Sequence, residues 1–357
     1  MKKFLPFFIL IAMAGFSFLI SLPACDKLVT EENTVNNYET VTVMDSTCVA
    51  ACHSDQNSVL DIAQEEFYNA GHASDSLVSA TVNDITLYNT SVCGPICHTS
   101  QGYIAQSTAA ISEPLPMTCK TCHDYHTTWD YTLRFDDPVA LKGGGTFDVS
   151  NSNNCAMCHK SLTDPVTKIK NIFDANANDS IQVSDFWGPH GSNQADMFLG
   201  QGGYEYSGVD YSNLKHAVSF TGGCVKCHIA VTNGFALGGH SMNMTDNGTE
   251  NIAACNVSGC HIASTSISAF DTYNNTTTLQ GYFDAMDSLT FKLDSLGLLD
   301  TLGYIHQEGV AGALYNYRFL TGDRSNGIHN PKYSLRLATS SLEYIQNYID
   351  SLNNPLP

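Results

Sequence analysis

The pattern of apolar and polar positions predicts helices at the C-terminal end of the chain. Between residues 278 and 352, apolar side chains recur every three or four residues in two stretches, as is typical of amphipathic helices. The first stretch comprises Leu279, Tyr282, Phe283, Met286, Leu289, Leu293 and Leu296, and the second comprises Leu335, Ala338, Leu342, Ile345, Ile349 and Leu352. A shorter helix is expected near residues 310–320, and Gly322 and Pro331 separate it from the last one. We therefore expect residues 265–357 to form a helical segment packed on the rest of the chain.

The N-terminal apolar run predicts an export signal. Met1-Lys2-Lys3 precedes an apolar stretch that extends to Leu22, and Leu22-Pro-Ala-Cys25 follows. A small residue before a cysteine is typical of cleavage that leaves a lipidated N-terminal cysteine, so residues 1–24 are interpreted as a lipoprotein signal and Cys25 as a membrane anchor. The alternative is an uncleaved membrane helix, because the run is nearly long enough to span a bilayer. Residues 25–47 are polar and are expected to form a tether with one strand near 38–44.

Composition predicts a loop-rich, strongly acidic protein. Charged residues make up only 14% of the chain, and the formal net charge is −19. Such a charge argues against binding to nucleic acid and to acidic lipid surfaces. It favours basic partners or a metal oxide surface, or it serves solubility alone. Together with the helical C-terminal pattern, this composition predicts a mainly α fold with much irregular loop.

Six cysteine pairs, each followed directly by a histidine, lie between residues 48 and 264. Three have the C-x-x-C-H spacing that marks covalent attachment of a c-type haem, two have three intervening residues and one has four. The copies are Cys48/Cys52/His53, Cys93/Cys97/His98, Cys119/Cys122/His123, Cys155/Cys158/His159, Cys224/Cys227/His228 and Cys255/Cys260/His261. The two thiols would add to the porphyrin vinyl groups, and the histidine would become the proximal iron ligand. An extra residue between the cysteines can loop out without moving the second cysteine and its histidine. We therefore expect six haem c groups in residues 48–264.

Three other uses of these cysteines fit the pattern poorly. A zinc site needs four Cys or His ligands, usually from paired C-x-x-C units, whereas every unit here ends in histidine. A disulfide framework would not place a histidine after each second cysteine. A thioredoxin-like motif would occur once. Cys25 is the one cysteine of thirteen that no motif uses.

The remaining histidines are enough to fill the second axial position of every haem. Thirteen histidines occur in the chain, and the seven outside the motifs are His72, His126, His190, His216, His240, His306 and His329. His190 and His329 stand in turn contexts that can aim a side chain inward, and His126 is expected to reach a neighbouring haem. His306 is the weakest candidate. Met242 and Met244 are the alternative ligands, more often found as packing residues.

Filled axial positions favour electron transfer over catalysis at iron. A haem with two protein ligands changes oxidation state with little rearrangement, whereas a reductase needs an open position beside acid, base or cationic groups. We therefore expect an electron carrier whose partners are other redox proteins or an extracellular acceptor.

Several segments resemble multihaem cytochromes of the ammonia-forming nitrite reductase superfamily. They are Trp187-Gly-Pro-His190-Gly-Ser-Asn-Gln-Ala-Asp-Met197, Gly203-Tyr204-Glu205-Tyr206 and Asp323-Arg-Ser-Asn-Gly-Ile-His329-Asn-Pro331-Lys-Tyr333. The resemblance implies a mainly α fold, close-packed haem pairs and long C-terminal helices. The nitrite reductases carry one haem with a lysine proximal ligand, whereas all six motifs here end in histidine, which favours electron transfer over nitrite reduction. A reductase of a small nitrogen or sulfur oxyanion remains an alternative.

A second analogy is to surface-anchored and filament-forming hexahaem cytochromes of metal-respiring bacteria. It implies a location at the outer membrane, the cell surface or the periplasmic face. It also raises the alternative that the chain is one subunit of a homopolymeric cytochrome filament.

Overall fold

The computed structural model describes residues 29–30, 42–43, 58–73, 94–111, 113–124, 131–175, 180–184, 187–211, 222–256, 261, 266–267, 272–273, 276–299 and 303–354. The chain divides into two compact units, Met1–Ile62 and Ala63–Pro357. In the first unit, β1 (Val29–Thr30) pairs antiparallel with β2 (Thr42–Val43), and β2 falls within the strand expected near 38–44. The predicted signal, Cys25 and the rest of the predicted tether lie outside the described residues.

Helices and irregular loops dominate the described chain, which confirms the mainly α prediction. Most helices before residue 278 have only one or two turns. They are α2 (Ser58–Tyr68), η1 (Gly71–Ala73), α5 (Gly94–His98), α6 (Ser100–Ala105), α7 (Cys119–Cys122), η2 (Ser150–Ser152), α9 (Asn153–Ala156), the π-helix η3 (Val166–Lys170), α10 (Asn171–Asp174), α11 (Gln194–Leu199), α13 (Gly223–His228) and η4 (Gly239–Ser241). The further strands have two residues each and are β3 (Val139–Ala140), β4 (Thr146–Phe147), β5 (Ile181–Gln182), β6 (Thr245–Asp246), β7 (Thr249–Glu250), β8 (Thr272–Tyr273), β9 (Thr276–Thr277) and β10 (Tyr304–Ile305).

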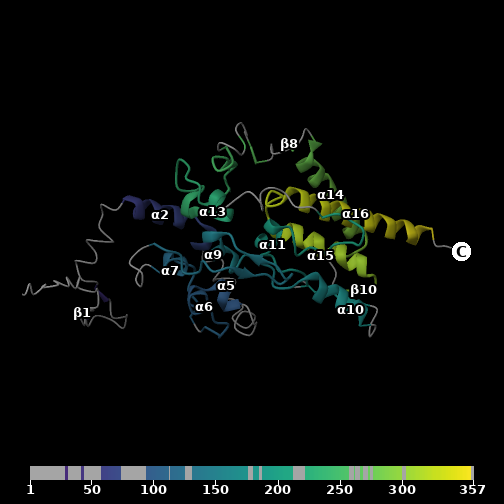
Figure 1. Ribbon diagram of the computed structural model, residues 1–357, viewed down its shortest axis with the longest axis horizontal. Helices are drawn as coiled ribbons and strands as arrows, with labels where there is room; N and C mark the ends of the chain where they lie inside the picture. The colour runs from purple at the N-terminus through teal and green to yellow at the C-terminus, as the bar shows by residue number, and fades with distance from the viewer. Residues whose placement is uncertain are drawn as a thin grey trace, which may run out of the picture. The chain divides into compact units, whose positions relative to one another are not determined.

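Three long helices form the C-terminal part, as the apolar periodicity predicts. They are α14 (Thr278–Ser295), α15 (Glu308–Asp323) and α16 (Pro331–Asn353), and they pack side by side (Figure 1). Arg324 ends α15 in the left-handed conformation, at φ 59°. Asn330 caps α16 by accepting a hydrogen bond from the Tyr333 amide, and Pro331 occupies the first turn, where its missing N–H is not needed. A loop of only seven residues, 324–330, therefore joins α15 to α16.

The buried face of α16 differs from the predicted stripe. Ala338 and Ile345 are fully buried as expected, but Leu352 is 56% exposed. Tyr333 and Leu337, which the stripe omitted, are fully buried as well. The reason is that α15 is buried along most of its length, so α16 packs against both α14 and α15 and its buried arc is wider than one apolar stripe.

The hydrophobic core of the C-terminal helices extends into residues 169–204, which lie well before them in the sequence. Ile169, Ile181, Trp187 and Tyr204 belong to the same buried cluster as Leu289, Leu314, Phe319 and Leu337. The β5–β10 pairing, with Ile181 opposite Ile305, ties the two regions together. The C-terminal helices therefore share one core with the long insertion between the fourth and fifth Cys–His motifs.

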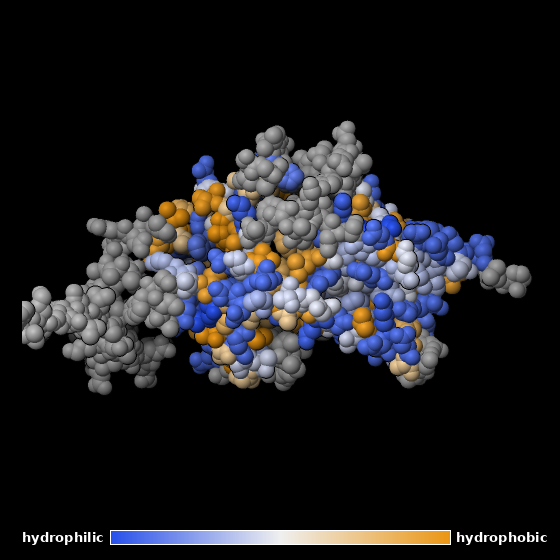
Figure 2. Space-filling view, in the orientation of Figure 1, coloured by the Kyte–Doolittle hydropathy of each residue, from blue (hydrophilic) through white to orange (hydrophobic). Residues whose placement is uncertain are grey.

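A second, smaller cluster contains Val139, Phe147, Ala156 and Phe198 and lies beside α9, which carries the fourth motif. On the face shown in Figure 2, apolar residues gather around α13 and toward the middle of the view, while much of the visible surface of the C-terminal helices is polar. Val231 and Phe235, in the loop after α13, are exposed. No helix in the described ranges has both the length and the apolar character that a membrane crossing requires.

Candidate functional site

Four of the Cys–His motifs lie on short helical turns. These are α5, α7, α9 and α13, which carry or lead into His98, His123, His159 and His228. The amides of His123 and His159 each donate a hydrogen bond to the carbonyl of the first cysteine of their own motif, at 2.9 Å. In the sixth motif, which has the longest spacing, the His261 amide donates to the Cys255 carbonyl in the same way, at 3.1 Å. The same backbone contact between the histidine and the first cysteine is therefore present at the short and at the longest spacing.

The structure places the rings of four motif histidines next to the rings of four histidines from elsewhere in the chain. The ring centres are 5.9 Å apart in one pair and 6.3 Å apart in the other three. The pairs are His159 with His72, His98 with His190, His123 with His240, and His228 with His329. Each pair joins residues distant in sequence, so tertiary packing is what brings the rings together.

The ring spacing fits two axial ligands of a single metal ion. A bond from a metal to an imidazole nitrogen is about 2 Å long, so two imidazoles on opposite sides of one ion have ring centres about 6 Å apart. The angles between the ring planes range from 44° to 89°. Such varied angles do not indicate a common stacking arrangement. What the pairs share is the separation, and that is the quantity that ligation of a metal constrains.

Hydrogen bonds to neutral oxygens orient three of the motif histidines. Nδ1 of His123 lies 2.7 Å from the Tyr131 carbonyl oxygen, and Nδ1 of His228 lies 2.8 Å from the Met242 carbonyl oxygen. A carbonyl only accepts, so Nδ1 carries the proton and Nε2 keeps the lone pair that binds metals. Met242, the alternative ligand, thus contributes its backbone oxygen here.

Gln194 orients the third of these histidines. Its amide nitrogen donates to the carbonyls of Gly322 and Asp323, at 3.2 and 3.3 Å. Its amide oxygen therefore faces Nδ1 of His159, 3.1 Å away, and accepts the proton there. Because Gln194 begins α11 and the two carbonyls end α15, this side chain links the fourth motif to the C-terminal helices.

Two carboxylates lie beside histidines that are outside the motifs. Asp323 Oδ1 is 2.7 Å from Nδ1 of His329, and the Asp323 side chain is 1% exposed. Glu66 Oε2 is 3.4 Å from Nδ1 of His240 and accepts a hydrogen bond from the His240 amide at 2.8 Å. Carboxylate partners of this kind are common behind metal-binding histidines, where they hold the ring and raise its basicity.

Burial keeps most of the paired histidines in the neutral form that binds metals. It lowers the pKa of His72 to about 4, with a further contribution from the charge of His159. Burial also lowers the pKa values of His98, His159, His190 and His228. His329 differs: burial alone would lower its pKa, but the charge of Asp323 and the hydrogen bond to it raise the pKa above its usual value.

Unusual backbone conformations place two of the non-motif histidines. His190 has φ 67°, a left-handed conformation that is uncommon outside glycine, and follows Gly188 at φ 128°. His240 follows Gly238 at φ 63°, where an added Cβ would lie 2.0 Å from the Ala230 carbonyl oxygen. Only glycine therefore fits at 238, because the turn that carries His240 passes directly against the backbone of Ala230.

Buried hydrogen bonds connect the second to fifth motifs. The hydroxyls of Ser100 and Thr121 are 2.7 Å apart, and the Tyr103 hydroxyl donates to the carbonyl of Asn154 at 2.9 Å. Ser152 donates to the Gly222 carbonyl at 2.7 Å. The four motif turns therefore form one contiguous group.

Cysteines from different motifs also meet within this group. A hydrogen bond with Cys158 lowers the pKa of the Cys97 thiol, and one with Cys155 lowers the pKa of the Cys224 thiol to about 7. The fourth motif therefore contacts the second motif through one cysteine and the fifth motif through the other. None of the cysteines that the structure describes forms a disulfide; they are Cys97, Cys119, Cys122, Cys155, Cys158, Cys224, Cys227 and Cys255.

The other predicted site residues lie outside these four pairs. His261 and His306 are exposed, and no histidine of the described ranges has its ring against that of His306. Met244 is half-buried. Outside the described residues lie Cys25, Cys48, Cys52, His53, Cys93, His126, His216 and Cys260.

The sequence analysis missed the three side chains that orient ligands. Gln194 and Asp323 stand within segments noted for their resemblance, four positions after His190 and six before His329, but nothing in the pattern assigned them a role. Glu66 lies in α2 without any local signal, because its contact with His240 spans 174 positions.

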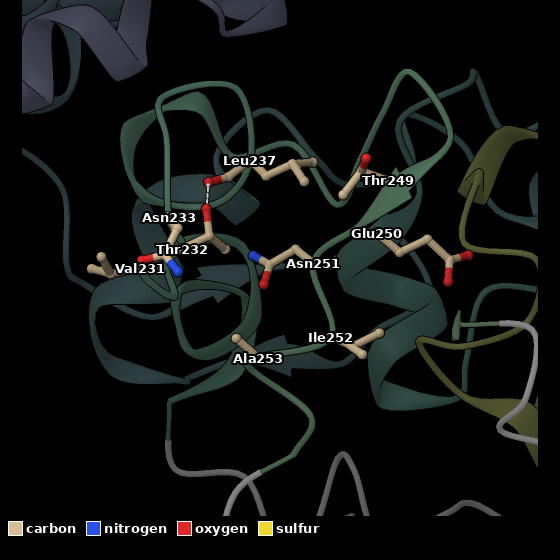
Figure 3. Close-up of a pocket in the computed structure, with 9 residues that line it drawn as sticks. All are labelled: Val231, Thr232, Asn233, Leu237, Thr249, Glu250, Asn251, Ile252 and Ala253. Carbon is tan, nitrogen blue, oxygen red and sulfur yellow. Dashed lines mark hydrogen bonds between the residues drawn. The ribbon is translucent and has the colours of Figure 1, made fainter. Parts of the chain in front are cut away.

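A cavity of about 400 Å³ lies between the segments that follow the fifth motif and precede the sixth. Figure 3 shows Asn251 near its middle, with Thr232 and Leu237 on one side and Ile252 and Ala253 below. Asn251 is buried, and its side-chain oxygen has no hydrogen-bond partner. The cavity ends two residues before Cys255, so a group attached at the sixth motif would adjoin it.

The paired histidines cannot complete a metal site alone. In the part of the chain that the structure describes, no group of three or more His, Cys, Asp or Glu side chains is placed to hold a metal ion. Two imidazoles on opposite sides of an ion leave the plane between them open for ligands from a bound group. A porphyrin supplies such ligands, and the adjacent cysteine thiols are groups that could attach it covalently.

Comparison with known protein families, curated proteins and solved structures gives no match to this chain. The chemistry of the site therefore has to be argued from its own residues.

Proposed function

We propose that this chain is an exported, lipid-anchored c-type cytochrome that binds six haems and transfers electrons. Its partners would be other redox proteins, basic ones among them, or an extracellular acceptor. Residues 1–24 and Cys25 would direct and anchor it, and the motifs in residues 48–264 would hold the haems. The four histidine pairs support the binding of haem, and the acidic composition supports basic partners.

The observation that carries the proposal is the pairing of the histidines. Each of four Cys–His motifs has its histidine opposite a second histidine, at 5.9 to 6.3 Å between ring centres. The cysteines of each motif lie directly before the paired histidine, where thioether bonds would tie a porphyrin across the gap. An ordinary cluster of packed histidines would have no reason to repeat this combination four times.

Ligation on both sides favours electron transfer. A haem bound this way supplies one-electron chemistry without an open coordination position for a substrate. Hydrogen bonds hold both sets of ligands in place. Tyr131, Met242 and Gln194 orient three motif histidines. Glu66 and Asp323 orient two of the opposite histidines. Ligands held in this way limit the movement that accompanies a change in the oxidation state of the iron.

The contacts between motifs support transfer from one haem to the next. Because Cys158 contacts Cys97 and Cys155 contacts Cys224, the attachment points of three motifs adjoin one another. The order suggested by these contacts places the fourth motif between the second and the fifth. Electrons would then pass along a path that differs from the order of the motifs in sequence.

The proposal is tested by producing the chain in a bacterial host that performs covalent haem attachment. We expect a mass increase of six haems over the processed chain, and an EPR spectrum of the oxidised protein with low-spin haem only. A protein without covalent haem contradicts the proposal. A large high-spin signal, together with turnover of nitrite, hydroxylamine or sulfite, would instead indicate the reductase alternative. Filaments in electron micrographs would indicate that the chain is a subunit of a cytochrome filament.

A further inference from the structure

We propose that Asp323 orients His329 and lowers the reduction potential of the haem held by His228 and His329, relative to haems whose ligands donate only to neutral oxygens. The inference rests on the proposed haem-binding function, but it concerns a residue that ligation itself does not require. Asp323 acts through His329 and is therefore a positioning residue.

The hydrogen bond between Asp323 and His329 is short and buried, and Ser325 contacts both residues. Asp323 Oδ1 lies 2.7 Å from Nδ1 of His329, and the carboxylate side chain is 1% exposed. Its other oxygen accepts a hydrogen bond from the Ser325 hydroxyl, and the same hydroxyl accepts one from the His329 amide at 3.2 Å. The loop between α15 and α16 thus closes on itself and places the carboxylate behind the imidazole.

The remaining oriented histidines lack a comparable charge. His123 and His228 donate to backbone carbonyls, and His159 donates to the amide oxygen of Gln194. Each of these acceptors is neutral. His240 has Glu66 nearby, but the 3.4 Å separation at Nδ1 is long for a hydrogen bond, and that carboxylate also accepts from the His240 amide. Among the histidines with a described partner at Nδ1, the effect is therefore expected to be largest at His329 and its opposite ligand His228.

Electrostatics gives the direction of the effect. An oxidised haem carries one more positive charge than a reduced one, so a nearby buried carboxylate stabilises the oxidised form. Burial strengthens this interaction because water screens it less. The hydrogen bond also makes the imidazole a more basic ligand, which acts in the same direction.

The test compares the native protein with an Asp323→Asn variant, both loaded with haem. Asparagine keeps the shape and an accepting oxygen but removes the charge. We expect the equilibrium constant for reduction of one haem to rise at least tenfold, which is about 59 mV for one electron. The measurement is a redox titration followed by the low-spin EPR signals. The His329→Ala variant identifies the signal concerned, because it makes that haem alone high-spin.

Two further variants serve as controls. Glu308→Gln also replaces a carboxylate by an amide, but Glu308 accepts from the Tyr204 hydroxyl instead of a histidine, so no haem is expected to shift by more than twofold. Ser325→Ala removes a donor from the Asp323 carboxylate and keeps its charge, so the same haem should become harder to reduce or stay unchanged. The Ser325→Ala variant tests the role of Asp323 if Asp323→Asn does not fold.

The outcomes separate this inference from the proposed function. An Asp323→Asn protein with six low-spin haems and unshifted potentials overturns the role of Asp323 and leaves electron transfer standing. A Ser325→Ala protein whose haem becomes easier to reduce by tenfold overturns it as well. Failure of the native chain to bind haem overturns the function on which the inference rests.

Discussion

Single residues decide how firmly each paired imidazole is held. A histidine ligand needs its Nε2 lone pair free, and a proton acceptor at Nδ1 ensures this. The structure provides such acceptors from three different chemical groups: carbonyls, an amide oxygen and carboxylates. The difference matters because only the carboxylates bring a charge.

The clearest prediction at this scale separates a paired histidine from an unpaired one. His190 faces His98 with ring centres 6.3 Å apart, whereas His306 is exposed and has no histidine ring beside it in the described ranges. Replacing His190 by Ala should open one haem of the six and give a high-spin EPR signal. The matched His306→Ala variant should remain fully low-spin. Equal spectra for the two variants would contradict the assignment of His190.

At the residue scale the sequence predicts the kinds of ligand but not their partners. The Cys–Cys–His motifs identify His98, His123, His159 and His228 by adjacency alone. The opposite rings come from positions 87 to 117 residues away, and packing places His72, and not His306, beside a motif histidine. The roles of Asp323 and Glu66 were not predicted, because an acidic residue in an acidic chain carries no distinguishing pattern.

At the scale of elements, the C-terminal helices organise the region around two of the pairs. The end of α15 supplies Asp323, and the cap of α16 follows directly after His329. Gln194 on α11 reaches both this loop and His159. The stability of the three-helix core should therefore influence the region of the paired histidines as well as the helices themselves.

A pair of leucines on α16 tests this core. Leu337 is fully buried, whereas Leu352 in the same helix is 56% exposed. Leu337→Ala is expected to lower the free energy of unfolding by about 2–5 kcal/mol, since it removes buried contacts and leaves a cavity. Leu352→Ala should change it by less than about 0.5 kcal/mol. Chemical denaturation followed by circular dichroism measures both, and similar losses would mean that the buried face of α16 is assigned wrongly.

Periodicity located these helices within a few residues but misjudged one buried face. An amphipathic stripe assumes that a helix packs on one side. The buried positions of α16 include Tyr333, Ser334 and Ser341, because neighbours contact it from two directions. Polar residues on a buried face cannot be recognised from hydrophobicity, although their hydroxyls find partners such as Met197 and Asn316.

At the scale of the whole molecule, charge governs encounters with partners. The chain has a formal net charge of −19, which produces a long-range attraction for cations. Electron transfer to a basic redox protein should therefore slow by about tenfold or more as ionic strength rises, because salt screens the attraction. Stopped-flow absorbance of the haems measures the rate. An acidic redox protein of similar potential is the control, and its rate should stay constant or rise with salt.

The sequence by itself determined which chemistry can be proposed for the chain. Motif spacing, histidine number and helical period are local properties, and they predict six covalent haems, enough second ligands and a helical C-terminus without reference to packing. The tertiary structure decided which histidine meets which motif, and which of those rings has a carboxylate behind it. It also joined the insertion at 160–206 and the C-terminal helices in one core. These are contacts between positions far apart in the chain, and they depend on how all the elements pack together.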